Sequence, residues 1–140
     1  MEFHQGRLVD HIHLRVTDLA ASKRFYTAAL TALGFADAVT DAPGYFAADE
    51  LWVDRAPGPV SQVHLAFQAQ DCGAVERFFA AAIAAGGKDN GAPGERTYRP
   101  GYYAAFVLDP DGNNIEAVYH GPVRKSAESV VVSSLAPSGQ

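Results

Sequence analysis

The fold of this chain is decided by residues 11–34, which read HIHLRVTDLAASKRFYTAALTALG, and by residues 64–87, which read HLAFQAQDCGAVERFFAAAIAAGG. The second stretch repeats the first at an offset of 53 positions without a gap. The matches that carry the signal pair histidine, aspartate, arginine, phenylalanine and glycine: His11/His64, Asp18/Asp71, Arg24/Arg77, Phe25/Phe78 and Gly34/Gly87. An internal repeat indicates two copies of one structural unit. We expect equivalent side chains to lie about a shared pseudo-twofold axis, where a site would form.

The first copy changes its hydrophobic period near Asp18. From residue 8 to 16, Leu8, Ile12, Leu14 and Val16 share one parity and alternate with polar residues, which predicts a half-buried strand over 8–16. Asp18 then offers a helix N-cap, apolar residues recur at helical spacing, and Gly34 ends the helix. We predict extended pieces at about 35–40, 44–48 and 50–55 before the Ala-Pro-Gly-Pro break at 56–59.

The second copy repeats this plan. The pattern predicts a strand at 62–69, a helix capped by Asp71, a Gly/Pro-bearing loop at 88–100, and strands at about 102–109 and 114–120. The chain is therefore predicted to be an α+β protein of two tandem β-α-β-β-β modules, with curved mixed sheets around a cleft. We place module 1 at about 7–56, a linker at 56–61, module 2 at 62–120 and a mobile tail at 121–140, within a single domain 1–140. Val130–Val132 in that tail predicts an edge strand or a partner contact.

The bulk composition limits the classes of partner. A chain of 140 residues with 48% hydrophobic and 19% charged residues is long enough to bury a core. The net charge of −5, without any basic block, argues against nucleic acid and against a polybasic membrane anchor, and favours small molecules. A single cysteine, Cys72, is consistent with a reducing compartment, and no apolar run approaches the length of a membrane span. We therefore expect a cytoplasmic protein.

Strand parity brings three metal-ligating side chains, two imidazoles and one carboxylate, onto one side. His11, His13 and Arg15 lie on the face opposite the apolar residues of the first strand, and His64 has the corresponding place in the second copy. In the last strand, Glu116 lies on the face opposite Ile115. Two imidazoles and one carboxylate leave coordination positions open on a divalent metal, which suits catalysis more than a structural role. The residue types suit Fe, Mn, Ni, Co or Zn without choosing among them.

Three stretches also carry a family resemblance. Residues 10–19 read DHIHLRVTDL, 63–67 read VHLAF, and 109–116 read DPDGNNIE. In this order on a duplicated chain, they resemble the vicinal oxygen chelate superfamily, the glyoxalase, bleomycin-resistance and extradiol-dioxygenase group. The resemblance implies a metal held by His11, His64 and Glu116, and a homodimer whose cleft is completed between two chains. It does not specify the reaction.

One position of the family pattern stays open. The four-ligand glyoxalase arrangement wants a further acidic or amide ligand on the last strand of module 1, where residues 50–54 read ELWVD. Either Glu50 or Asp54 is a candidate for that ligand, and Trp52 is an alternative occupant of the cleft. We count Glu50 with Glu116 and His13 as candidate proton-transfer groups.

The remaining candidates would line the substrate pocket. Arg15 and Arg99 are candidates for pairing with an anionic substrate. The aromatic and acidic candidates are Trp52, Tyr102, Tyr103 and Asp54. The leading hypothesis is a metal-dependent enzyme that chelates a small oxygen-bearing substrate, with isomerase or lyase chemistry favoured over dioxygenation. The alternative is a metal-free protein that binds an antibiotic or another small molecule, as in the bleomycin-resistance branch.

Overall fold

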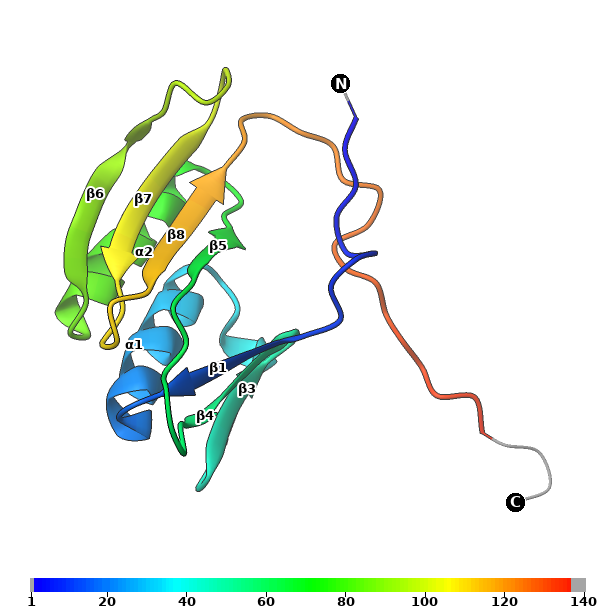
Figure 1. Cartoon of the computed structure of the whole chain (residues 1–140). Coiled ribbons are helices and arrows are strands. Elements are labelled where there is room, and N and C mark those ends of the chain that lie inside the picture. The colour runs from blue at the N-terminus through cyan, green and yellow to red at the C-terminus, as the bar shows by residue number, and fades with distance from the viewer. Residues whose placement is uncertain (1, 137–140) are drawn as a thin grey trace.

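The computed structural model describes residues 2–136 and contains two β-α-β-β-β modules (Figure 1). Module 1 consists of β1 (Ile12–Val16), α1 (Leu19–Ala32), a short 3-10 helix η1 (Ala36–Ala38), β2 (Val39–Ala42), β3 (Tyr45–Ala48) and β4 (Leu51–Arg55). Module 2 consists of β5 (His64–Gln68), α2 (Cys72–Ala84), β6 (Lys88–Glu95), β7 (Tyr103–Leu108) and β8 (Asn114–Tyr119). The predicted α+β fold of two tandem modules is confirmed.

Each module forms one four-stranded mixed sheet, with the strand order β1-β4-β3-β2 in the first and β5-β8-β7-β6 in the second. The first strand of each module pairs in parallel with the last, and the other pairings are antiparallel. Side chains alternate between the two faces of a strand. The first and last strands of a module therefore present neighbouring side chains on the same face, although they lie about forty to fifty residues apart in the chain.

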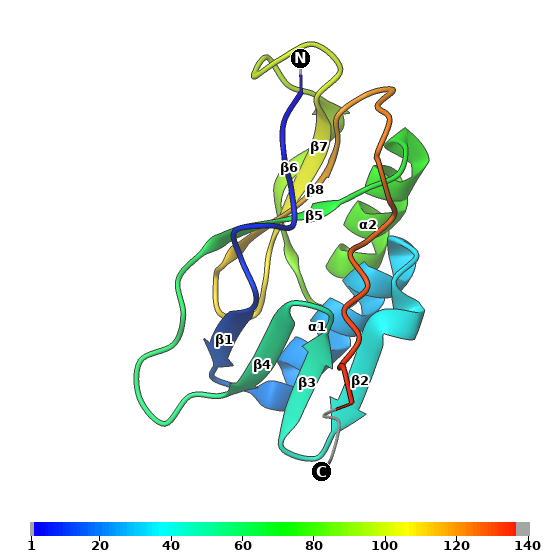
Figure 2. The same ribbon diagram turned by 90° about the vertical axis from the view of Figure 1, so that its right-hand side faces the viewer.

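The two helices pack against each other and against their sheets. Each begins at the predicted cap: the carboxylate of Asp18 accepts a hydrogen bond from the backbone N–H of Ala21 at 3.1 Å, and that of Asp71 from Ala74 at 2.7 Å. One continuous core includes residues of both modules, among them Phe25 and Phe78, which are equivalent in the repeat. Because this core fills the helix side, the opposite faces of the sheets remain free to form a site (Figure 2).

A buried polar contact joins the modules. The hydroxyl of Tyr26 on α1 donates to the carboxylate of Asp109, in the turn between β7 and β8, at 2.5 Å. Asp109 also accepts hydrogen bonds from the side-chain amide and the backbone N–H of Asn113. Burial and the neighbouring carboxylate raise the pKa of Tyr26, so its hydroxyl stays a donor. This network fixes the β7–β8 turn against the first helix.

Three sequence predictions are wrong in detail. Residues 88–95 form strand β6, where a loop was expected, because they pair with β7 despite a Gly- and Pro-bearing sequence of low strand propensity. Leu8 lies outside β1 and is 93% exposed. Within the described part of the tail, Val130–Val132 form no strand, so the edge-strand alternative is wrong and the partner contact stays a prediction. Residues 137–140 of the predicted tail lie outside the described residues.

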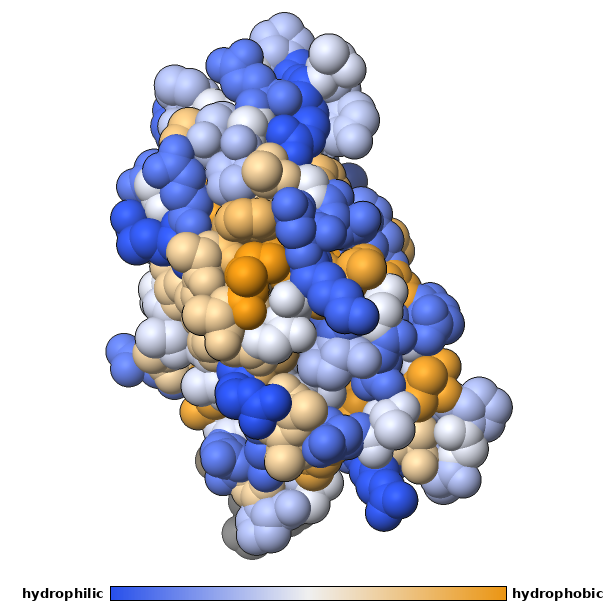
Figure 3. Space-filling model, turned by 90° about the vertical axis from the view of Figure 1, so that its left-hand side faces the viewer, coloured by the Kyte–Doolittle hydropathy of each residue, from blue (hydrophilic) through white to orange (hydrophobic). Residues whose placement is uncertain are grey.

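The described terminal segments, which we call the N-terminal arm (2–11) and the C-terminal arm (121–136), contain most of the exposed large apolar side chains. These are Phe3, Leu8, Val9, Val123, Val130, Val131, Val132 and Leu135. The C-terminal arm stands away from both modules (Figure 1). On the face turned away from the arms, apolar groups gather across the middle and hydrophilic ones surround them (Figure 3). The large apolar side chains that are exposed are nevertheless concentrated in the arms.

Candidate functional site

A histidine and a carboxylate meet on the open face of module 2. His64 begins β5 and pairs in register with Asn114, so Glu116, two residues further along β8, is its diagonal neighbour. Nε2 of His64 lies 2.8 Å from Oε1 of Glu116. His64 is exposed, whereas Glu116 is only 1% exposed. The imidazole therefore forms the outer edge of this pair and the carboxylate its buried base.

Both carboxylate oxygens of Glu116 have protein partners. The second oxygen, Oε2, accepts a hydrogen bond from the hydroxyl of Tyr102. Burial, and then the hydrogen bond to Glu116, raise the pKa of Tyr102, so the hydroxyl remains protonated and keeps donating. A buried carboxylate needs such partners, because an unpaired charge away from water is strongly unfavourable. Tyr102 thus fixes the orientation of Glu116.

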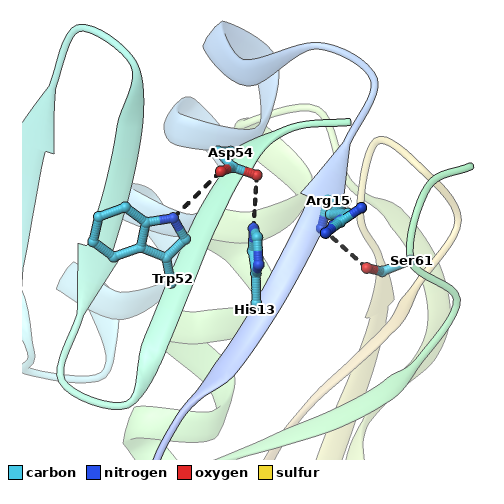
Figure 4. Close-up of polar contacts among 5 residues, drawn as sticks. All are labelled: His13, Arg15, Trp52, Asp54 and Ser61. Carbon is cyan, nitrogen blue, oxygen red and sulfur yellow. Dashed lines mark hydrogen bonds and ion pairs between the residues drawn. The ribbon is translucent and has the colours of Figure 1, made fainter. Parts of the chain in front are cut away.

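Module 1 holds a second histidine–carboxylate pair, shown in Figure 4. Nε2 of His13 on β1 lies 2.7 Å from Oδ1 of Asp54 on β4, and the indole N–H of Trp52 donates to the other carboxylate oxygen at 3.5 Å. The hydrogen bond from His13 is the main cause that lowers the pKa of Asp54. The carboxylate of Asp54 therefore orients one imidazole ring and one indole ring.

The strand register identifies which residue of module 1 matches Glu116. Ile12 pairs with Leu51, which puts His11 level with Glu50, just as His64 is level with Asn114. The position two residues further along the last strand holds Glu116 in module 2 and Trp52 in module 1. An indole, which is not a metal ligand, thus replaces the carboxylate of the four-ligand pattern.

Trp52 forms one side of an open hollow on module 1. Its ring stacks on Tyr45, with the centroids 4.1 Å apart and the planes 14° from parallel. The hollow has a volume of about 380 Å³ and is lined by His11, His13, Ala47, Asp49, Glu50, Leu51 and Trp52. Four of the predicted site residues, His11, His13, Glu50 and Trp52, thus share one hollow, whose volume suits a molecule of one or two rings.

The three predicted metal ligands do not meet within one chain. Among residues 2–136, no group of three His, Cys, Asp or Glu side chains is close enough to hold a metal ion. His64 and Glu116 form their pair on module 2, whereas the exposed imidazole of His11 lies 2.7 Å from its neighbour Asp10 on module 1. A metal centre of these three side chains would require a second copy of the chain.

The other pocket candidates are dispersed. Arg99 donates to Nδ1 of His120 at 2.5 Å and lies over the ring of Phe3 in the N-terminal arm. The hydroxyl of Tyr103 donates to Glu76 on α2, so this tyrosine is on the helix face of its sheet, opposite to Tyr102. Burial and the charge of Arg99 lower the pKa of His120.

Arg15 is near the site but lines neither of the hollows described. The backbone N–H of Arg15 donates a hydrogen bond to the hydroxyl of Ser61, in the segment that leads into β5 (Figure 4). The carbonyl of Arg15 accepts one from the backbone N–H of the same serine. The charge of its guanidinium contributes slightly to the lowered pKa of Asp54.

Sequence reasoning missed two contributors to the open faces. Tyr45 supports Trp52, and Arg96 lines a second hollow of about 280 Å³ on module 2, with Asn90, Gly91, Tyr98, Phe106 and Asn114. The only signal for Arg96 was its place in the segment 88–100, which lengthens the second copy.

Two tandem modules that present imidazoles and carboxylates on open sheet faces define a class of small proteins that bind compact ligands there. The chain matches the family model of the Glyoxalase/Bleomycin resistance protein/Dioxygenase superfamily over residues 8–117. It belongs to that superfamily.

Solved structures agree with this assignment. A glyoxalase/bleomycin resistance protein from Albidiferax ferrireducens T118 is 29% identical, with a TM-score of 0.64 over 79% of this chain and 97% of that one. A glyoxalase-related enzyme from Fulvimarina pelagi is 23% identical, with a TM-score of 0.67 over 93% of this chain and 99% of that one. The oxidase ChaP-H1 is 25% identical, with a TM-score of 0.58 over 81% and 95%.

Among curated proteins, no relative matches the chain significantly. No helix in the described range 2–136 is long and apolar enough to cross a membrane.

Proposed function

We propose that this chain is a metal-dependent enzyme in which His64 and Glu116, with His11 of a second copy, hold a divalent cation against a small oxygen-bearing substrate. The observation that carries the proposal is the contact of 2.8 Å between His64 and the buried carboxylate of Glu116. A carboxylate is rarely buried at the base of an open face, because its burial is unfavourable without a compensating charge.

The donor set fits a divalent transition metal. An imidazole nitrogen and a carboxylate oxygen are typical ligands of Fe, Mn, Ni, Co and Zn. The exposed ring of His64 can turn its Nε2 from the carboxylate to an ion without disturbing the core. Tyr102 occupies Oε2 of Glu116, which leaves Oε1 as the oxygen available to the ion.

A homodimer would supply the missing ligand. His11 and the His64–Glu116 pair lie on the open faces of different modules, so a second copy that faces the first across these surfaces brings one His11 to each pair. The apolar side chains of both arms support such an association, because eight of the twelve exposed large apolar side chains among residues 2–136 lie there. In a two-fold dimer the same contact forms twice and produces two equivalent sites.

When bound, the ion supplies Lewis-acid stabilisation of negative charge on the substrate oxygens. The chain's own residues would do the rest. His13, oriented by Asp54, and Glu50 line the module 1 hollow, where each can take or return a proton. Trp52, stacked on Tyr45, forms an apolar side of that hollow. Isomerisation and elimination both require a proton to be moved at a substrate carbon, so these groups favour an isomerase or lyase over a dioxygenase.

The test measures metal content and thermal stability. Wild-type protein should retain a divalent ion, and addition of Mn²⁺, Ni²⁺, Zn²⁺ or Fe²⁺ should raise its Tm, because a ligand that binds only the folded state stabilises it. His64→Ala and Glu116→Gln should lose both effects, whereas His4→Ala, a change in the exposed N-terminal arm, should keep them. Wild-type protein that binds none of these ions would refute the proposal.

A metal-free binding protein is the second candidate. It is favoured by one observation: the stacked Tyr45–Trp52 pair borders a hollow that needs no ion to bind an apolar ring. The same metal titration separates the two functions. A binding protein would show no shift with any metal and would instead bind aromatic small molecules in a manner that Trp52→Ala abolishes.

A further inference from the structure

The segment that lengthens module 2, residues 88–100, holds the guanidinium of one arginine, Arg96, in a defined position. In module 1, β2 pairs with β3 in continuous register, whereas β6 shifts its register against β7 between Asp89 and Gly91 and again between Gly91 and Gly94. Such irregularities turn backbone groups out of the ladder. The displaced carbonyl groups of this segment point to the guanidinium of Arg96.

Three backbone carbonyls hold that guanidinium. Nη1 of Arg96 donates to the carbonyls of Gly94 at 2.9 Å and Glu95 at 3.3 Å, and Nη2 donates to that of Ala92 at 2.8 Å. The guanidinium also lies over the ring of Phe106, 5.3 Å from its centroid. This side chain is therefore fixed in place before any ligand arrives.

Two glycines leave room for this guanidinium. A Cβ at Gly94 would lie 3.2 Å from Nη1 of Arg96, and one at Gly91 would lie 3.3 Å from Nη2 and 3.0 Å from Phe106. Gly91 also has φ of +148°, a conformation that other residues rarely adopt. Because neither glycine has a side chain, the backbone can lie this close to the guanidinium.

The charge of Arg96 has no acidic partner within 4 Å among the described residues. The nearby carboxylate of Asp89 accepts a hydrogen bond from the backbone of Gly91 and does not line the hollow. Three hydrogen bonds to carbonyls leave two of the five guanidinium N–H groups free. An unpaired, half-buried cation with free donors beside a hollow of about 280 Å³ is suited to an oxyanion.

This hollow adjoins the proposed metal pair. Phe106 is the register partner of Glu116, and its ring centroid lies 6.0 Å from that of His64. Arg96 lies over the same ring, so the guanidinium and the His64–Glu116 pair are both neighbours of Phe106. The amides of Asn90 and Asn114, bonded to each other at 3.1 Å, add neutral polar groups to the wall.

We propose that Arg96 binds an oxyanionic group of the substrate, a carboxylate or a phosphate-type group, at one end of the module 2 face. For the rest of the substrate, whose oxygens would lie at the metal pair, this inference rests on the proposed function. The substrate is then a small anion whose charged group lies at Arg96 while its chelating oxygens lie at the metal pair. Arg99, in contrast, has its guanidinium bonded to His120 and lines neither of the hollows described.

The experiment uses two probes of the same shape, benzoate and the neutral benzamide, in metal-free protein. Binding is followed by NMR through the backbone amides of Gly91 and Asn114 and the Nε–H signal of Arg96. Benzoate should bind at least about tenfold more tightly than benzamide, because charge-assisted hydrogen bonds to arginine are among the strongest in proteins. Arg96→Gln should abolish this preference. Arg77→Gln removes the same charge on the exposed surface of α2 and should keep it.

A second variant guards against a folding defect in Arg96→Gln. Asn114→Asp keeps the oxygen that accepts from Asn90 and adds a negative charge in the hollow. It should weaken benzoate by about tenfold and leave benzamide unchanged. Equal binding of the two probes by wild-type protein, or wild-type behaviour of folded Arg96→Gln, would overturn the inference. Since no metal is present, the result is independent of the metal titration that tests the proposed function.

Discussion

His13 and Asp54 join the first and last strands of module 1 by the same diagonal contact that joins His64 and Glu116 in module 2. The two distances between Nε2 and the carboxylate oxygen are 2.7 and 2.8 Å. In each module the carboxylate lies two residues beyond the register partner of the histidine. The pair of module 1 is shifted by two residues along the strands relative to that of module 2. The repeat therefore keeps the type of contact while moving its position.

If the metal site is built between two copies, two inactive variants should restore it when mixed. His11→Ala and His64→Ala chains each lack one ligand of every site in their own dimers. Unfolding and refolding an equal mixture should form heterodimers with one intact site, so metal binding should recover to about one quarter of the wild-type sites. Isothermal titration with Ni²⁺ would measure this recovery. A single-chain site would show none.

Tyr102→Phe should destabilise the protein. The change removes the donor to Oε2 of the buried Glu116 and leaves a carboxylate oxygen unpaired. We expect the free energy of unfolding to fall by about 1–3 kcal/mol, the usual effect of an unsatisfied buried acceptor. Urea denaturation would measure it. Tyr98→Phe is the matched control, because Tyr98 is 67% exposed and packs edge-on against Tyr102, and its loss of a hydroxyl should have little effect.

The carboxyl group of Asp54 should titrate below the usual aspartate range. The hydrogen bond from His13 is the leading cause of its lowered pKa, so His13→Ala should raise that pKa, and Trp52→Phe should raise it less. A depressed folded pKa contributes stability above the unfolded pKa, near 3.9, and that contribution is lost as the pH falls through the folded value. Titration of the ¹³C carboxyl signal would measure the shift. An unchanged pKa in His13→Ala would contradict the assignment.

Gly87→Ala should be among the most damaging single substitutions. A Cβ there would lie 2.4 Å from Val107, 2.7 Å from Phe25 and 2.8 Å from the carbonyl of Ala82, all in the core. Overpacking of this severity should lower the free energy of unfolding by about 3 kcal/mol. Gly44→Ala meets nothing within 4 Å and should change it by less than about 0.5 kcal/mol. Thermal unfolding of both variants would make the comparison.

Much of the fold was predictable because the signals are local. The alternation around Ile12 and Leu14, and the caps Asp18 and Asp71, depend on neighbours in sequence, and the structure contains both. Strand β6 was not predictable, because residues 88–95 have little strand propensity and are extended only by pairing with β7. The family was predictable because its motifs are short and ordered along the chain, and the family match over 8–117 confirms it.

By itself, the sequence determined that two related modules exist, that His11, His64 and Glu116 lie on the non-core faces of their strands, and that the modules differ at 50–54 and 88–100. Parity and periodicity are properties of consecutive residues, so the chain alone carries them. Only the tertiary structure decided that Trp52 is the counterpart of Glu116, that Asp54 belongs to His13, and that the three proposed ligands do not meet in one chain. Strand register and the placement of one module on the other depend on contacts between residues far apart in sequence, which no local pattern encodes.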